Sequence, residues 1–573
     1  MNMRYIIVVL FLILSLQSSD MKYLKFKTDG VFDDKRLYDE MDIERVSWYQ
    51  FWKDQTPKIN IKLINSIEDS LISFYKSQGY YHVRVEANET NETILFDIKA
   101  NSPIVVKSIQ SNLEPKYRKL IKLKKDKKFK AFNFINSKKD IKHKLLEDGF
   151  CNYNLKAKAR IDIEKDISFI TFFLTKNKKC KIGDITIHAP KNIHKKVITS
   201  RLNFKKGDDY SSKRVNDSYS TLSGLGAFDR VQIETNKHNS NMNIDINLLK
   251  KVKRVRQEAG IGYETDLGMK SVFRWEQRNY KGDAKKISFD LKYSKKEKFI
   301  KNSFFWPAIS ALPYYPNHYI DLNNEFIYSE VNLNSFNEKK YANYLHFMKD
   351  YFLYSIDLGV GLEHITIQKR GDICNIIDGK FFLFFPFAKF IIDTRDSKLN
   401  PKNGIYLSNS FEMGIKSFAN SSTYSKFITE ARIIQTLGDL TIAAKGKLGL
   451  IQEFENRLPE SKLFLGGGAF SNRAYGYKKI GAYDAQCDEV GGRTMIATTI
   501  EASHPIYKKL EGAIFYDTTL ISKDSFYFNT DFRHSVGFGF RYITPIGPVK
   551  IDFGLDIENY SQNTIHFQIG QSF

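Results

Sequence analysis

The sequence contains few cysteines and no series of apolar segments that would build a bundle of transmembrane helices. Four cysteines in 573 residues exclude a disulfide-dense scaffold, and no two of them form a CxxC pair of the kind that binds zinc. With 42% hydrophobic residues and a mean hydropathy of -0.39, the chain is neither a polytopic helical membrane protein nor a disordered polymer. The length suggests about four domains.

Sequence motifs of the common enzyme classes are missing as well. There is no GxSxG nucleophile turn, no HExxH zinc motif and no glycine-rich loop that ends in Lys-Ser/Thr, and the eleven histidines are scattered. The segment GGGAFSNR at 466–473 has the glycines of a phosphate-binding loop but lacks its lysine. We therefore predict a protein that is not an enzyme and has no cofactor or metal.

Positive charge is abundant and concentrated in one region. The net charge is +23, and residues 101–200 hold 25 Lys/Arg against nine Asp/Glu, which places +16 of it there. A solvated, lysine-rich surface is the simpler interpretation. The alternative is a docking face for an acidic partner or for anionic lipid headgroups.

The N-terminus has the features of an export signal. Arg4 precedes a ten-residue apolar run, and small residues follow at 15–19, so we expect a signal peptide over residues 1–19. An uncleaved anchor or a buried first helix is the alternative. Export argues against a nucleic-acid partner, because the mature chain would leave the compartment that holds nucleic acid.

One pattern occurs three times in the next 230 residues. An amphipathic helix ends at a glycine and an aromatic residue, and two alternating strands follow; the pairs are Gly79-Tyr80, Gly149-Phe150, and Gly226 with Phe228. The glycines lie 70 and 77 residues apart, which is typical of small repeated modules. A strand and a first helix precede each copy, so the predicted order is β-α-α-β-β. The first copy is the least regular, with an insertion or altered first helix at 30–58. An ordinary α/β domain with chance spacing is the alternative.

From residue 254 the hydrophobic period changes from that of helices to that of strands. Val536, Phe538 and Phe540 fall on one face of a strand, and Gly537 and Gly539 fall on the other. This alternation is expected of a barrel whose outer face contacts lipid and whose polar face lines the lumen. A soluble β-sandwich also alternates, but its outer face would carry charges.

Turn signals divide this region into about sixteen strands. Three short connections, at 278–284, 393–404 and 544–548, would be turns at one end of the barrel. The longest loop, about 453–493, falls between the eleventh and twelfth strands. Its centre combines glycines, one arginine and spaced aromatics, which indicates a tightly folded loop that carries one positive charge into a confined space. The residues of this motif are Gly467, Gly468, Arg473, Tyr475, Gly476 and Tyr477.

With this loop, the repeats and the terminal aromatic residue, the chain from about residue 22 to 573 resembles the BamA/TamA family. The repeats resemble POTRA domains, and three of them suit the TamA branch best. The resemblance implies α+β POTRA repeats followed by a sixteen-stranded antiparallel barrel in the bacterial outer membrane, with the POTRA arm in the periplasm. The expected boundaries are 1–19 for the signal peptide, 20–101, 102–179 and 180–250 for the POTRA-like modules, and 254–573 for the barrel.

The resemblance also assigns roles to particular residues. The family's loop arginine falls on Arg473, and acidic residues of the next two strands, Glu501 and Asp517, would hold it inside the barrel. The flanking Asn472 and Ala474 depart from the family pattern, which has a branched apolar residue and a glycine there. The alternative is that both carboxylates simply line the lumen. The first and last strands, about 256–263 and 564–573, would form a seam, with the C-terminal signal at Ile569, Gly570 and Phe573.

The cysteines fall into two pairs by position. Cys151 and Cys180 lie nearly opposite each other across the predicted hairpin of the second module, and Cys374 and Cys487 fall in two extracellular loops. Export permits both disulfides. Four free thiols are the alternative.

The implied function is assembly or translocation of outer-membrane proteins through the seam. The expected partners are unfolded outer-membrane protein clients, a TamB-like periplasmic protein and outer-membrane lipid, with no nucleic acid. Three alternatives stay open: a general BamA-type assembly factor, a two-partner secretion transporter, and a passive porin.

Overall fold

The structure is a computed structural model that describes most of the chain after residue 20. The described ranges are 21–43, 56–239, 241–251, 253–264, 267–312, 315–351, 353–370, 376–398, 400–416, 422–482, 490–507, 509–528, 531–544, 547–558, 560 and 562–569. The predicted signal peptide therefore lies outside the described residues. The chain divides into two compact units. One contains the first two modules and part of the third, and the other contains the rest of the third module and the barrel.

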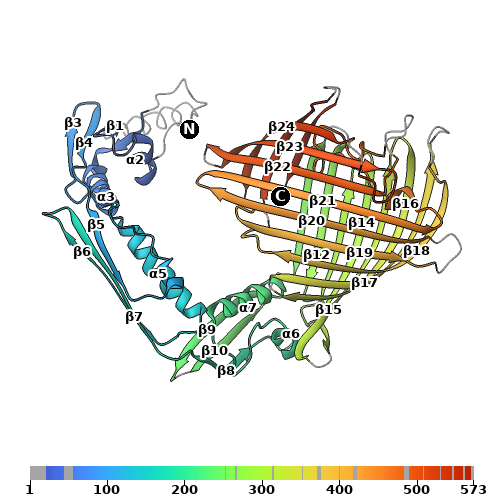
Figure 1. The fold of residues 1–573 in the computed structure, drawn as a ribbon, viewed down its shortest axis with the longest axis horizontal. Helices are drawn as coiled ribbons and strands as arrows, with labels where there is room; N and C mark the ends of the chain where they lie inside the picture. The colour runs from blue at the N-terminus through green and yellow to red at the C-terminus, as the bar shows by residue number, and fades with distance from the viewer. Residues whose placement is uncertain are drawn as a thin grey trace, which may run out of the picture. The chain divides into compact units, whose positions relative to one another are not determined.

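The order β-α-α-β-β occurs in the second and third modules before the barrel. The second module has β5 (Val105–Ser111), α4 (Pro115–Arg118), α5 (Ala131–Glu147), β6 (Tyr153–Asp162) and β7 (Ile167–Lys176). The third has β8 (Lys181–His188), α6 (Lys195–Thr199), α7 (Ser212–Gly224), β9 (Phe228–His238) and β10 (Asn241–Lys250). Their sheets have the orders β5-β7-β6 and β8-β10-β9. Figure 1 shows α5 lying along its sheet, where Ile141 and Leu145 pack with Ile170 and Phe172.

The first module departs from this order in the region where the sequence is irregular. Its elements are β1 (Met21–Thr28), α2 (Asp34–Glu40), β2 (Lys58–Asn60), the 3-10 turn η1 (Ile61–Leu63), α3 (Ile64–Ser77), β3 (Arg84–Glu89) and β4 (Thr93–Lys99). The additional strand β2 pairs antiparallel with β1 and gives the sheet the order β2-β1-β4-β3.

The repeated glycine is also the point where one module meets the next. Gly79 and Gly149 have φ of +97° and +94°, which suits the residue that ends a helix. The Gly149 carbonyl accepts a 2.9 Å hydrogen bond from the Cys180 N–H, just before β8. A Cβ on Gly149 would lie 2.7 Å from the Tyr210 carbonyl oxygen of the third module. Gly149 thus has two roles: it ends the helix α5, and it permits close backbone contact between the second and third modules.

A disulfide between Cys151 and Cys180 closes the same junction, with a Cα–Cα distance of 5.8 Å. It joins the residue two positions before β6 to the residue before β8. The other predicted pair, Cys374 and Cys487, lies outside the described residues.

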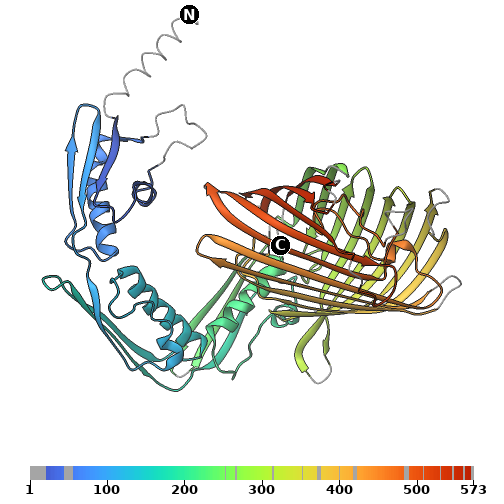
Figure 2. The same cartoon turned by 45° about the horizontal axis from the view of Figure 1, so that its top comes forward.

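Sixteen antiparallel strands form the barrel and lie side by side in chain order (Figure 2). They are β11 (Val255–Glu264), β12 (Gly268–Arg278), β13 (Lys286–Tyr293), β14 (Glu297–Leu312), β15 (Tyr315–Asn332), β16 (Phe336–Tyr351), β17 (Tyr354–Lys369), β18 (Gly379–Asp393), β19 (Gly404–Gly414), β20 (Thr423–Leu437), β21 (Leu440–Glu455), β22 (Thr494–Tyr507), β23 (Leu510–Ser522), β24 (Arg533–Thr544), β25 (Gly547–Asp556) and β26 (Asn563–Ile569). The predicted fold class is confirmed. None of the described helices is long and apolar enough to cross a membrane.

The strands alternate as the sequence predicts. In β24, Val536, Phe538 and Phe540 are exposed on the outer wall, whereas Ser535 and Arg541 are buried toward the lumen. An apolar outer face is favourable in lipid, and pairing between neighbouring strands satisfies backbone polar groups that lipid cannot hydrogen-bond.

Polar contacts hold the segment around α6 against one rim of the barrel. The Arg201 guanidinium donates two 2.7 Å hydrogen bonds to the Asp321 carboxylate of β15. Asp321 also accepts a 2.9 Å bond from the Ala308 N–H, at a register shift of the β14–β15 pair. His194 contacts Asp283 in the turn after β12, with 2.6 Å between Nδ1 and Oδ1.

Replacing Gly149 with alanine should loosen the junction between the second and third modules once the disulfide is reduced. Gly207→Ala is the matched control, because Gly207 also has positive φ (+91°) but a Cβ there would have no neighbour within 4 Å. Both variants carry backbone strain of about 1–2 kcal/mol, and Gly149→Ala adds the clash with Tyr210. With reductant, trypsin should cut at Lys178 or Lys179 faster in Gly149→Ala than in Gly207→Ala. Equal cleavage rates in the two variants would show that Gly149 is needed only to end the helix and not for the contact between modules.

Candidate functional site

The connection between β21 and β22 folds back against the inner wall of the barrel. We call residues 456–493 the plug loop; residues 483–489 of it are outside the described ranges. Its apolar residues Leu463, Phe464 and Ile480 share one buried cluster with Ile365 of β17 and Phe385 of β18. The loop therefore fills part of the lumen.

A tight turn brings the loop arginine to the wall. Gly467 has a φ of +88°, and a Cβ there would lie 2.5 Å from the Gly476 carbonyl oxygen. The Gly468 N–H donates to the Tyr475 carbonyl over 2.9 Å. These two glycines let the chain close on itself and direct Arg473 away from the turn.

Arg473 lies between the two carboxylates that the family resemblance assigns to it. Its Nε and Nη2 each donate a 2.9 Å hydrogen bond to Asp517 of β23, and its backbone N–H donates to the same carboxylate over 3.1 Å. Its Nη1 donates to Glu501 of β22 over 2.7 Å. The guanidinium carbon lies 3.3 Å from the centre of the Phe515 ring. Arg473 is 4% exposed and Asp517 is fully buried.

Three further charges complete this network, and sequence reasoning did not find them. Arg541 of β24 donates to Glu501 over 3.0 Å and also to Asp552 of β25. Lys550 lies 3.9 Å from Asp552. Three cations, Arg473, Arg541 and Lys550, thus face three carboxylates, Glu501, Asp517 and Asp552. A balanced, hydrogen-bonded set is the arrangement in which buried charge is tolerated.

The tip of the plug loop also contacts the last strand. The Thr564 hydroxyl of β26 donates to the Ala474 carbonyl over 3.0 Å, and His566 Nε2 lies 3.1 Å from the Arg473 carbonyl oxygen. A Cβ on Gly554 of β25 would lie 2.3 Å from that oxygen. A glycine is therefore needed on the wall beside the tip, whereas Ala474 of the loop is accommodated and fully buried.

The last strand is held mainly from one side. β26 pairs with β25 over seven residues, from Asn563 to Ile569, and β11 pairs with β12 over ten. Among the described residues, β11 and β26 share one residue pair, Glu264 with His566. Ile569 pairs with Val549, and Gly570 and Phe573 lie outside the described residues. We call the boundary between β11 and β26 the seam.

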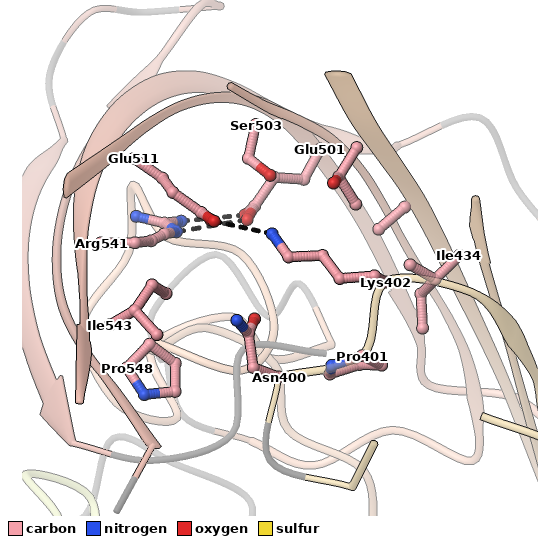
Figure 3. Close-up of a pocket in the computed structure, with 12 residues that line it drawn as sticks. Asn400, Pro401, Lys402, Ile434, Glu501, Ser503, Glu511, Arg541, Ile543 and Pro548 are labelled. Atoms are coloured by element: carbon pink, nitrogen blue, oxygen red, sulfur yellow. Dashed lines mark hydrogen bonds and ion pairs between the residues drawn. The ribbon is translucent and has the colours of Figure 1, made fainter. Parts of the chain in front are cut away.

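The turn between β18 and β19 reaches the inner wall of the barrel. Lys402, in the turn between β18 and β19, points toward Glu511 of β23, and its Nζ lies 2.7 Å from that carboxylate (Figure 3). Arg541 and Glu501 lie in the same view, so this contact is next to the charge network. The enclosed cavity here is about 20 Å³, which is room for about one water molecule.

The remaining motif residues lie around a larger cavity in the lumen. Gly467, Gly468 and Tyr477 line a cavity of about 730 Å³, together with lysines of β12, β13 and β21. Tyr475 is buried with the apolar cluster of the loop. Within the described ranges, no group of three or more His, Cys, Asp or Glu residues is placed to hold a metal ion.

Comparisons with known proteins agree with this architecture. The Omp85 superfamily domain model matches residues 279–573, and the POTRA model, described as a surface antigen variable number repeat, matches residues 180–251. The chain belongs to the Omp85 superfamily. This confirms the predicted relationship and places the barrel in the outer membrane, with its POTRA arm in the periplasm. It also supports the prediction that the chain is not an enzyme.

Individual relatives are distant. The outer membrane protein assembly factor BamA of Nitratidesulfovibrio vulgaris is 21% identical over 485 residues, which cover 79% of this chain and 60% of BamA. The crystal structure of BamA from Haemophilus ducreyi lacking POTRA domains 1–3 matches with a TM-score of 0.51 at 15% identity, covering 82% of this chain and 99% of that one. CdiB from Escherichia coli matches with a TM-score of 0.50 at 11% identity, covering 89% and 96%. These structural matches show the shared fold.

Arg473→Ala should release the tip of the plug loop and lower the stability of the barrel. It would leave the buried Asp517 carboxylate without its ion-pair partner, at a cost of about 3–5 kcal/mol. Heat-modifiable mobility in SDS gels should show a lower unfolding temperature, and protease should cut the loop faster. The double variant Arg473→Ala with Asp517→Asn should recover the unfolding temperature, because the unpaired buried charge is removed. Its plug loop should still be cut faster by protease than that of the wild type.

The control is Arg533→Ala. Arg533 forms a 3.5 Å pair with Glu558 in which both side chains are about one-third exposed, so its loss should cost at most about 1 kcal/mol. Equal effects of Arg533→Ala and Arg473→Ala would contradict a special role for the buried network.

Proposed function

We propose that this chain is an outer-membrane protein assembly or translocation factor that acts on unfolded β-barrel or autotransporter-type clients through its own seam. The observation that carries the proposal is the seam itself. One residue pair joins β11 to β26 in the described structure, whereas neighbouring strands pair over seven and ten residues. A strand edge that shares few residue pairs with its neighbour is a template for an additional strand.

The modules support a role in receiving clients. β6, at the edge of the second sheet, is ten residues long. An extended client segment can add to such an edge by main-chain hydrogen bonds. Lys156, Lys158 and Arg160 are exposed along β6, so a client segment with acidic residues would suit this edge best.

The plug loop argues against a passive porin. A porin of sixteen strands leaves a water-filled channel. Here the plug loop packs into the lumen, and the turn at Lys402 contacts Glu511 of the wall. Single-channel recordings that showed a large, steady conductance would favour the porin instead.

Among assembly factors, the number of modules favours the TamA-like alternative. Three modules are more than the two expected of a two-partner secretion transporter, and fewer than a general BamA-type factor normally carries. A TamB-like partner and outer-membrane lipid belong to this proposal.

Closing the seam covalently should stop client insertion. Gly262 and Phe567 lie close to each other across it, since a Cβ on Gly262 would lie 3.8 Å from the Phe567 ring. We would place cysteines at both positions in a chain whose Cys374 and Cys487 are replaced by serine, and reconstitute it in liposomes. Urea-unfolded autotransporter β-domain and a small outer-membrane barrel would be the clients. Oxidation should abolish their folding, and reduction should restore it.

The matched control is a disulfide between Ile514→Cys and Phe538→Cys. These residues pair directly on the ordinary β23–β24 ladder, and both are exposed on the outer wall. This cross-link should leave insertion unchanged. Full insertion with the seam cross-linked would refute the lateral route. If oxidation abolishes folding of the autotransporter domain alone, the TamA-like role is favoured. If it abolishes folding of both clients, the role of a general assembly factor is favoured.

A further inference from the structure

A second group of buried charges holds the plug loop at a different sector of the wall. Lys462 lies at the end of a short 3-10 turn, η2 (Glu460–Lys462), near the start of the loop, and is 7% exposed. Its Nζ lies 3.1 Å from Glu363 of β17 and 3.1 Å from Glu412 of β19. The ammonium group also lies 3.9 Å from the centre of the Phe385 ring of β18. One loop lysine thus contacts three consecutive strands.

Neighbouring side chains add hydrogen bonds to this group. Lys426 of β20 donates to the backbone carbonyl of Lys462 over 2.7 Å. The Tyr424 hydroxyl donates to Glu412 over 2.9 Å, and the Tyr344 hydroxyl contacts Glu363. Two lysines therefore lie beside two glutamates, and a tyrosine hydroxyl contacts each glutamate. We call these six residues, Tyr344, Glu363, Glu412, Tyr424, Lys426 and Lys462, the root cluster.

The root cluster and the Arg473 network contact different strands. The root cluster involves β16, β17, β19 and β20, whereas Arg473 contacts β22 and β23, and its backbone contacts β26. Between Lys462 and Arg473 the chain contains three consecutive glycines, Gly466 to Gly468. Glycine allows the widest range of backbone conformations, so this is the segment best able to bend if one attachment is lost.

We propose that Lys462 is a second anchor of the plug loop, which fixes the root of the loop while the Arg473 tip is the attachment that can separate from the wall. A loop held at its root stays in the lumen when the tip moves, and the tip then stops holding Thr564 and His566 of β26. Movement of the tip rests on the proposed function, in which a client separates β26 from β11 at the seam. The two-anchor geometry itself does not depend on it.

Channel recordings test the two anchors independently of any client. Each anchor is removed with its charges kept in balance: Lys462→Met with Glu412→Gln for the root, and Arg473→Ala with Asp517→Asn for the tip. The full chain is incorporated into planar bilayers after its folding is checked by heat-modifiable mobility. Each pair of substitutions alone should cause brief, partial openings. All four together should raise the mean conductance severalfold, toward that of an open sixteen-stranded pore.

Two controls separate anchoring from other effects of the substitution. Lys447→Met removes a different lumen lysine, which lines the large cavity, and should leave the conductance close to that of the wild type. Lys462→Arg keeps a cation between the two glutamates and should also behave as the wild type. If the root variant matches the wild type, and adding it to the tip variant changes nothing, Lys462 is not an anchor.

The result is separable from the client experiment. The conductance could follow the two-anchor pattern while a chain with a cross-linked seam still inserts clients. That combination would support Lys462 as an anchor and would refute the proposed function. Full opening by the root variant alone would also contradict the proposal, because the tip would then hold nothing by itself.

Discussion

Buried charge in the lumen is the constraint on which the arrangement of this barrel depends. A carboxylate such as Asp517, fully buried on β23, is stable only with a cation beside it, and the cation is carried by a loop rather than by a neighbouring strand. The loop must therefore return into the lumen for the wall to be stable. Its glycine turn, its apolar packing and its contacts with β26 follow from that requirement.

This dependence links the loop to the boundary between β11 and β26. β26 has one described pair with β11, so part of what holds it comes from the lumen side, through Thr564 and His566. Both side chains contact the backbone beside Arg473. The ion pairs of Arg473 thus stabilise the loop directly and the last strand indirectly. Contacts from the lumen side thus help to hold a strand that has one described residue pair with its neighbour β11.

Much of the fold could be predicted from the sequence because its signals are local. Period-two alternation such as Val536, Phe538, Phe540 gives strands and their lipid-facing side, and glycine-aromatic pairs such as Gly149-Phe150 give the helix ends of the modules. The turns at 278–284, 393–404 and 544–548 fall between the second and third, eighth and ninth, and fourteenth and fifteenth strands of the barrel. Such features depend on neighbouring residues in the chain.

The rest depends on register around the barrel, which a single sequence does not encode locally. Arg541 and Asp552 lie on the polar faces of β24 and β25, but their contact with each other and with Glu501 requires three strands to be aligned. Lys462 carried no motif at all, since its partners are 99 and 50 residues away in the chain. The contact of Gly149 with the third module could likewise not be predicted, because the end of a helix already explains a glycine at this position.

The most direct test of this account is a complementation experiment in cells depleted of the chromosomal copy, with outer-membrane proteomics as the readout. Wild-type protein should restore the affected barrel proteins. Arg473→Ala should restore few or none, although it is present in the outer membrane at a comparable level. Full restoration by Arg473→Ala would show that client assembly does not need the anchored loop. Depletion without change in any barrel protein would contradict the assembly function itself.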